Sequence, residues 1–225
     1  MMIGKQANKQ SLKVAVFCLR NSTGGFTIIE SLVAILVVSV LLVAIAPVLS
    51  LSVATRVQSR RVELATQAAR SYIDAVKTKK VAAPTSTGSN TLTAYAAPTA
   101  TGTLTCPTAN SYCTSSTELY CVDFDSSGSC ENTSLTDMIV QGFRYNSASS
   151  NASSGYALGV RVYRADAFKQ STTLLKNTST TKTTQATYTG GAGQRKAPLV
   201  EMTTDINDTV PKYTDLCARY TGGCN

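Results

Sequence analysis

The chain has 225 residues, enough for one ordinary domain with a core and some accessory segments. It contains no histidine, which excludes imidazole bases, Ser–His or Cys–His nucleophile pairs and histidine-ligated metal sites, so we expect neither an enzyme nor a cofactor. The formal net charge is +8, but residues 81–225 hold ten basic and ten acidic residues, and we therefore expect no nucleic-acid partner.

A polar, basic leader without acidic residues occupies 1–25, and an apolar segment with Glu30 as its only charged residue follows at 26–55. About 20 apolar residues at a rise of about 1.5 Å span a bilayer core of about 30 Å, so 26–55 predicts a transmembrane helix. A secretory signal peptide fits less well, because its apolar region is usually about 7–15 residues long. Membrane helices tolerate proline, so we expect the helix to continue through Pro47, either as a harmless kink or as a functional hinge.

The next segment, 56–80, is rich in good helix formers and contains neither glycine nor proline. Its apolar residues recur at spacings that place them near one helix face: Val57, Leu64, Ala68, Ala75 and Val76. We therefore expect one nearly continuous helix over about 26–80, transmembrane at first and amphipathic from 56 onward.

The remaining segment, 81–225, has the pattern of a β-rich head. Strict alternation at 156–163 predicts a half-buried strand, and 138–145 precedes it across a Ser/Asn-rich loop, which favours antiparallel pairing. Weaker strands are expected at 119–124 and 199–203, a short helix at 166–175, and irregular segments at 82–105 and 176–194. The predicted fold class is α+β, with a long N-terminal helix packed on a small antiparallel sheet.

The junction of leader and helix, 24–32, combines a leader that ends in Gly25, an aromatic Phe26 and the lone carboxylate of Glu30. A charged group at membrane depth is costly and by default functional. Cleavage after Gly25 would leave an ammonium group on Phe26, with which Glu30 of a neighbouring subunit could pair. That attraction is far stronger in a low dielectric than in water, so we expect it to recruit subunits into a helical assembly.

Over 20–50 the sequence resembles the N-termini of type IV pilins and type II secretion pseudopilins. The resemblance implies a pilin-like fold, cleavage by prepilin peptidase after Gly25, methylation of Phe26 and an assembly role for Glu30. Pro47 falls where these pilins often have a helix-interrupting proline. The implied partners are prepilin peptidase, other pilins or pseudopilins, and the assembly platform of the inner membrane. The implied location is a single pass through that membrane with the head outside the cytoplasm, followed by a pilus or pseudopilus.

A narrower resemblance covers 52–58 and 60–70, which are similar to cyanobacterial minor pseudopilins linked to hormogonium polysaccharide secretion. It implies a minor component of a pilus-like machine for motility or polymer export. The other interpretation of the same stretch is a solvated helix face that packs on the head.

Seven cysteines are present, and Cys18 would leave with the leader. Six remain in the head: Cys106, Cys113, Cys121, Cys130, Cys217 and Cys224. An even set in a Ser/Thr-rich region indicates disulfides in an oxidising compartment, and six cysteines allow fifteen connectivities. We favour neighbour pairing, with Cys217–Cys224 closing a small loop as in many pilins. Zinc is the weaker alternative, because no C-x-x-C pair occurs.

Residues 123–129 partly resemble the start of an EF-hand calcium loop, with Asp123 and Asp125 at alternate positions and Gly128 at the turn. Ser134 stands at the twelfth position, where a bidentate Glu is needed. We therefore favour a plain acidic turn and expect no metal, with calcium as the weaker alternative.

Three functions follow from these features. The favoured one is a minor pilin or pseudopilin that assembles through its helix for motility, polysaccharide export or protein export. The second is an adhesive or DNA-binding tip pilin, and the third is a membrane-anchored exported domain that never assembles. The expected division of the chain is a leader at 1–25, a long helix at 26–80 and a disulfide-bonded head at 81–225.

Overall fold

The computed structural model describes Gly25, 27–85, 91–146, 151–178, 180–183, Gln185, 195–207, 212–218 and Cys224. The predictions for the first 24 residues and for Phe26 lie outside the described residues. The chain divides into two compact units, Met1–Pro47 and Val48–Asn225.

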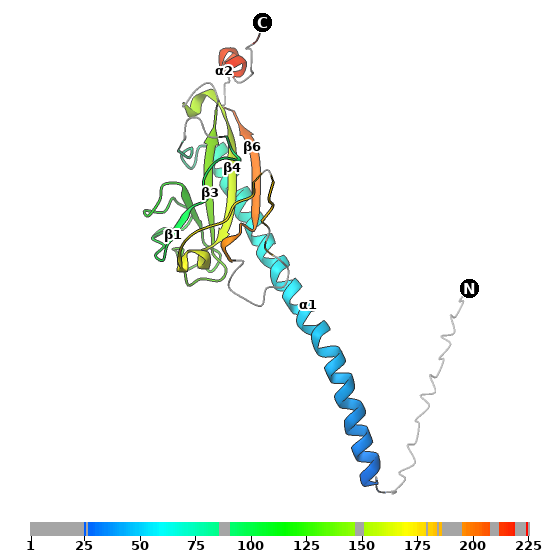
Figure 1. Ribbon diagram of the computed structural model, residues 1–225. Coiled ribbons are helices and arrows are strands. Elements are labelled where there is room, and N and C mark those ends of the chain that lie inside the picture. The colour runs from blue at the N-terminus through cyan, green and yellow to red at the C-terminus, as the bar shows by residue number, and fades with distance from the viewer. Residues whose placement is uncertain are drawn as a thin grey trace, which may run out of the picture. The chain divides into compact units, whose positions relative to one another are not determined.

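Helix α1 (Ile28–Lys77) continues through Pro47 and contributes residues to both units (Figure 1). Its C-terminus is a Schellman motif: the Lys79 N–H donates to the Val76 carbonyl at 3.1 Å and the Lys80 N–H to the Ala75 carbonyl at 2.9 Å. Lys79 takes the left-handed conformation that this motif requires, with φ of 57°. The helix therefore ends three residues before the expected boundary at Lys80.

The head contains a four-stranded antiparallel sheet in the order β2-β3-β4-β6. Its strands are β2 (Leu119–Val122), β3 (Met138–Tyr145), β4 (Tyr156–Arg164) and β6 (Val200–Ile206). Figure 1 shows β3, β4 and β6 side by side. A second sheet pairs β1 (Thr99–Thr101) with β5 (Ser171–Thr173). The remaining elements are η1 (Ala152–Ser154), η2 (Ala165–Lys169) and α2 (Tyr213–Ala218). The predicted α+β class is confirmed.

The short helix expected over 166–175 is present only in its first part, and the prediction was wrong beyond Lys169. The 3₁₀ helix η2 ends at Lys169, and the next residues form β5, in which Thr172 pairs with Ala100 of β1. Ser171, Thr172 and Thr173 are better suited to a strand than to a helix, because β-branched side chains and hydroxyl groups weaken helices. The segment 82–105, expected to be irregular, supplies the partner strand.

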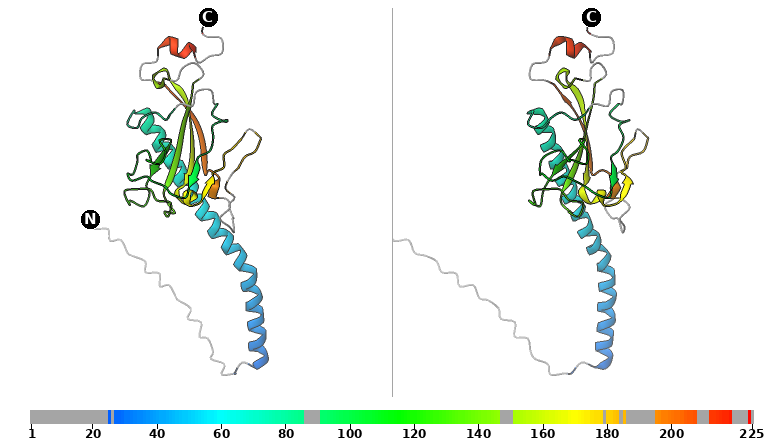
Figure 2. Two further views of the ribbon diagram at one scale, coloured as in Figure 1. Left: turned by 60° about the vertical axis from the view of Figure 1, so that its left-hand side comes forward. Right: turned by 90° about the vertical axis from the view of Figure 1, so that its left-hand side faces the viewer.

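The strand predicted at 156–163 is confirmed as β4, but the prediction that it is half-buried was wrong, because both faces of the sheet are covered. In Figure 2, α1 lies against one face of the sheet. The core on this face contains Leu158, Val160 and Val162. The other core covers the opposite face and contains Tyr163, Phe168 and two disulfides. Segments distant in sequence cover a face that the alternating pattern assigned to solvent.

The residues of α1 that pack on the sheet form one buried stripe along the helix. It consists of Leu64, Ala65, Ala68, Ala69, Tyr72, Ile73 and Val76. Val57, expected on this face, is 44% exposed because it precedes the stripe. Gly142 of β3 lies opposite Tyr72, where an added Cβ would stand 2.0 Å from the phenol oxygen, so only glycine fits.

Candidate functional site

The start of α1 contains Glu30, the residue on which the predicted assembly role rests. Gly25 is exposed and precedes the helix, and Thr27 caps it: the Glu30 N–H donates to Thr27 Oγ1 at 3.3 Å, and the Ser31 N–H to the Thr27 carbonyl at 3.1 Å. Thr27 and Glu30 thus occupy the first and fourth positions of a capping box. A carboxylate there also faces the positive end of the helix dipole. The T-x-x-E pattern would have predicted this cap, which the sequence reasoning missed.

Large apolar side chains cover the surface of α1 from Ile28 to Val53, and each is at least half exposed. The hydroxyl groups on this surface turn back onto the helix, with Ser31 Oγ donating to the Ile28 carbonyl at 2.8 Å and Ser39 Oγ to the Ile35 carbonyl at 2.7 Å. Such polar groups are satisfied without water. Among the described helices, α1 is the one long and apolar enough to cross a membrane. An apolar surface of this extent needs lipid or other protein to cover it.

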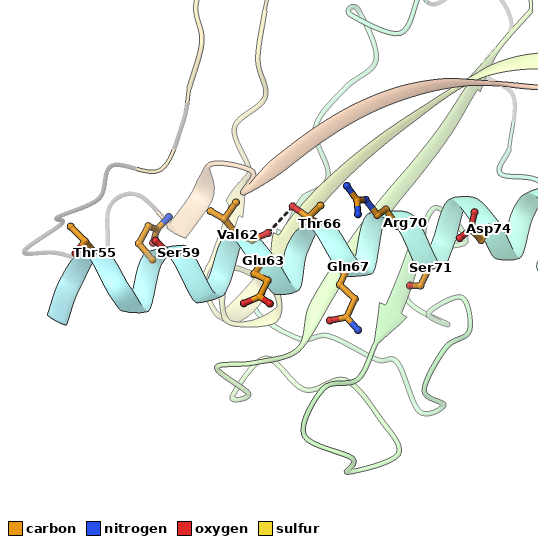
Figure 3. A pocket seen from close by; sticks show the side chains of 10 residues that line it. Thr55, Ser59, Val62, Glu63, Thr66, Gln67, Arg70, Ser71 and Asp74 are labelled. Carbon is orange, nitrogen blue, oxygen red and sulfur yellow. Dashed lines mark hydrogen bonds between the residues drawn. The ribbon is translucent and has the colours of Figure 1, made fainter. Parts of the chain in front are cut away.

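A polar strip follows on the same helix, between Thr55 and Asp74 (Figure 3). All of its lining residues come from α1, so it is an open helix face and not an enclosed cavity. Arg60 and Glu63 form an ion pair at 2.8 Å with both side chains about two-thirds exposed, which contributes little to stability. This face is available to another protein surface.

The six head cysteines form three disulfides between neighbours: Cys106–Cys113, Cys121–Cys130 and Cys217–Cys224. This is the favoured pairing, and it engages all the thiols that zinc would need. Cys106 and Cys130 also meet in a β-bridge, which places the first two disulfides side by side in the core that contains Phe168. Disulfide formation of this kind is typical of an oxidising compartment.

A buried guanidinium holds the segment before β1 on the sheet. Arg161 is 2% exposed, and its Nε pairs with Glu201 at 3.0 Å. Its Nη1 donates to the carbonyls of Tyr95 at 3.1 Å and Ala96 at 3.2 Å. The sequence pattern assigned Arg161 to a solvent face, but these contacts give it a structural role.

A basic hollow beside η2 was not predicted from the sequence. Lys169, Arg195 and Lys196 line it together with Asp166, which is 5% exposed and pairs with Arg164. Burial lowers the pKa of Arg164, while the neighbouring Asp166 opposes that shift. The residues that line the hollow have a net positive charge, although residues 81–225 as a whole have a net charge of zero.

The loop between β2 and β3 contains the calcium candidates Asp123 and Asp125. The structure brings a third carboxylate to them: one oxygen each of Asp123, Asp125 and Asp137 lie within 4.8 Å of one another. Ser134, which replaces the expected Glu, donates its hydroxyl to Asp125 Oδ2 at 2.8 Å. Asp137 escaped the sequence analysis because it lies beyond the twelfth position of the loop.

Comparison with known proteins bears on the N-terminal segment alone. Residues 20–46 match the family model of the prokaryotic N-terminal methylation motif. The matched segment contains Gly25, Phe26 and Glu30, and it supports the type IV pilin-like resemblance and the membrane-anchored helix with prepilin-type processing. No curated protein and no solved structure matches the chain.

Proposed function

We propose that this chain is a minor pilin or pseudopilin, a structural subunit of a type IV pilus-like or secretion pseudopilus machine. Its role is assembly for motility, polysaccharide export or protein export, without enzymatic chemistry. The observation that carries the proposal is the lone carboxylate of Glu30 at the start of an exposed apolar helix, inside a segment that matches the methylation motif.

The assembly step begins with a precursor anchored in the inner membrane by the apolar part of α1, with the head on the extracytoplasmic side. Three disulfides support that orientation, because the cytoplasm keeps thiols reduced. Prepilin peptidase removes 1–25 and methylates Phe26. The assembly platform then brings subunits together, and the new ammonium group of one pairs with Glu30 of the next while their apolar helix surfaces pack.

Among these roles, the resemblance of 52–58 and 60–70 to cyanobacterial minor pseudopilins favours a machine for motility or polysaccharide export. Within the second stretch, Leu64 and Ala68 pack on this chain's own sheet, whereas Val62 and Glu63 lie outside the buried stripe. The part outside the stripe is therefore the part available to another subunit. Neighbouring genes for other prepilin-like proteins and glycosyltransferases would support this assignment, and a neighbourhood without either would contradict it.

A second candidate is an adhesive or DNA-binding tip pilin that uses the same helix. The basic hollow at Lys169, Arg195 and Lys196 favours it, because clustered cations attract anionic ligands. Retention of the purified chain on heparin or DNA, lost on Lys169→Glu and kept in Lys212→Glu, would support this candidate. If the wild-type chain is not retained on heparin or DNA at low salt, this candidate function is excluded.

The charge-pairing step can be tested without disturbing the helix cap. Glu30→Gln removes the charge but keeps an N3 side chain that a capping box accepts. We expect the variant to be cleaved normally by a co-expressed prepilin peptidase but to be absent from sheared filaments. Asp205→Asn, which neutralises an exposed carboxylate of β6 away from α1, is the control and should incorporate normally. Incorporation of Glu30→Gln at the wild-type level would contradict the mechanism.

A further inference from the structure

The basic hollow beside η2 has a volume of about 350 Å³, near the lower end of the range of about 300–1,000 Å³ that is usual for ligand pockets. Three cationic side chains line it, those of Lys169, Arg195 and Lys196. Among the described residues of the lining, Asp166 provides the one carboxylate, and this carboxylate pairs with the buried Arg164. Together with Arg164, the site therefore has four cations and one carboxylate.

The cations of this site lie close enough to oppose one another. Burial lowers the pKa of Arg164, Asp166 raises it, and the charges of Arg61 and Arg195 lower it again. Arg61 belongs to α1 and Arg195 to the segment before β6, so the fold brings together like charges that are distant in the sequence. Like charges at short range are unfavourable without an opposite charge between them. An anion in the hollow would supply that charge.

The cations of the hollow have donor groups to spare. In the described part of the chain, Lys169 is exposed and forms no hydrogen bond or ion pair. Arg195 directs its Nε toward Asp166 Oδ2 at 3.7 Å, which leaves its two terminal nitrogens for a ligand. Lys196 is held in place by Thr172, whose Oγ1 accepts a hydrogen bond from Lys196 Nζ at 3.0 Å. One anchored cation and two cations with free donors thus line the same hollow.

The other lining residues indicate what kind of molecule would carry the anionic group. Gln170 and Thr172 provide an amide and a hydroxyl group beside the cations, and no aromatic side chain occurs among the described lining residues. Proteins that bind single-stranded nucleic acids stack the bases on aromatic side chains and follow the backbone with a positively charged groove. A short cationic site with neutral hydrogen-bonding groups instead suits a hydroxyl-rich ring that has an acidic group.

We infer that this hollow binds an acidic sugar residue of a polysaccharide. The carboxylate or sulfate group of the sugar lies between Lys169, Arg195 and Lys196. The hydroxyl groups of its ring form hydrogen bonds with Gln170 and Thr172. The planar guanidinium of Arg195 can donate to two oxygen atoms of the acidic group side by side. The inference rests on the proposed role in polysaccharide export, and it identifies the exported polymer as an acidic one.

The test uses the full-length chain in detergent micelles at about 150 mM salt, where attraction between exposed charges is largely screened. Calorimetric titration compares a galacturonate hexasaccharide, a carrageenan hexasaccharide with sulfate but no carboxylate, neutral maltohexaose and a single-stranded hexadeoxynucleotide. At least one acidic hexasaccharide should bind at least about tenfold more tightly than maltohexaose and the oligonucleotide. The tighter of the two acidic ligands shows whether the hollow selects carboxylate or sulfate.

Charge reversal in the hollow tests whether these residues form the site. Lys169→Glu and Arg195→Glu should each weaken binding of the acidic hexasaccharide by at least about tenfold, because each replaces an attraction by a repulsion. Both side chains are exposed, so the variants should melt near the wild-type temperature. Lys212→Glu makes the same change of charge outside the hollow and should bind like the wild type.

Three results would overturn the inference. They are acidic hexasaccharides that bind no more tightly than maltohexaose, an oligonucleotide that binds as tightly as they do, and wild-type affinity in Lys169→Glu and Arg195→Glu. None of these results affects the assembly role, because cleavage and incorporation are measured separately with Glu30→Gln. A chain that binds the acidic hexasaccharide but is never incorporated into filaments would contradict the assembly role and not the sugar site.

Discussion

Tyr72 of α1 and Tyr112 of the Cys106–Cys113 loop share a hydrogen bond between their phenol oxygens at 2.9 Å. Tyr112 donates its own proton to the Ala82 carbonyl at 2.8 Å, so Tyr72 is the donor of the shared bond. The two rings meet edge to face, at 84° and 6.3 Å between centroids. One pair of phenols thereby connects the helix, the segment that follows it and a disulfide-bonded loop.

The alkaline stability of the head should depend on these phenols. Burial, reinforced by the Tyr112 contact, raises the pKa of Tyr72 far above its usual value, and burial raises the pKa of Tyr156 to about 12. Unfolded tyrosines titrate near pH 10. Because the pKa values are higher in the folded state, deprotonation favours the unfolded state. The free energy of unfolding therefore falls as pH rises above about 10.

Melting temperatures of the full-length chain in micelles, measured by circular dichroism from about pH 8 to 11, test this expectation. Tyr72→Phe removes one such phenol, at a cost of about 1 kcal/mol for its lost hydrogen bond, and should show a shallower fall in melting temperature above about pH 10. Parallel pH profiles for the wild type and Tyr72→Phe would contradict the assignment.

Gly142→Ala should destabilise the packing of α1 on the sheet. The new Cβ would lie 2.0 Å from Tyr72 Oη and 2.6 Å from Cζ, and Tyr120 packs on the Tyr72 ring at 5.0 Å between centroids, which limits its movement. Overpacking of this kind typically costs about 1–3 kcal/mol of unfolding free energy. Urea unfolding in micelles measures the loss.

The double variant Gly142→Ala with Tyr72→Ala provides the control for that experiment. Once the ring of Tyr72 is gone, the methyl group added at position 142 has room, so the double variant should be no less stable than Tyr72→Ala alone. Strictly additive losses would show that the clash with Tyr72 is not the cause.

The three disulfides should differ in their resistance to reduction. The sulfur atoms of the first two belong to cysteines that are at most 2% exposed, whereas Cys224 is exposed and Cys217 partly so. Thiol–disulfide exchange requires access to a sulfur atom, so dithiothreitol should open Cys217–Cys224 in the folded chain and the other two only after unfolding. Differential alkylation followed by mass spectrometry distinguishes the cases. Equal reduction rates for Cys121–Cys130 and Cys217–Cys224 would contradict the described burial.

Local patterns were sufficient to predict much of the fold. The strand at 156–163 follows from alternation over a few residues, and 138–145 from its position across a short loop. Helix α1 follows from an apolar run long enough to span a bilayer and from the helix formers after it. The second buried face of the sheet could not be predicted this way. In the sequence, Arg161 is typical of a surface residue. The Tyr95 and Ala96 carbonyls that accept its hydrogen bonds lie about 65 positions away in the chain. Periodicity does not report such distant contacts.

The candidate sites divide in the same way. Glu30 stands out because a single charge in an apolar run is visible in the sequence itself. Asp137 does not, since its neighbours form an ordinary strand and only folding brings it to Asp123 and Asp125. The capping role of Thr27 was visible in the sequence as T-x-x-E but was overlooked beside the functional interpretation of Glu30.

The central claim is that a peptidase converts this chain into a subunit that starts at Phe26. Intact mass measurement and N-terminal sequencing of the chain, purified from cells with and without prepilin peptidase, test it most directly. With the peptidase, we predict loss of 1–25 and a methylated Phe26 at the N-terminus, and Gly25→Leu should prevent the cut. A chain that still begins at Met1 in the presence of active peptidase, or that is cut elsewhere, would contradict the account.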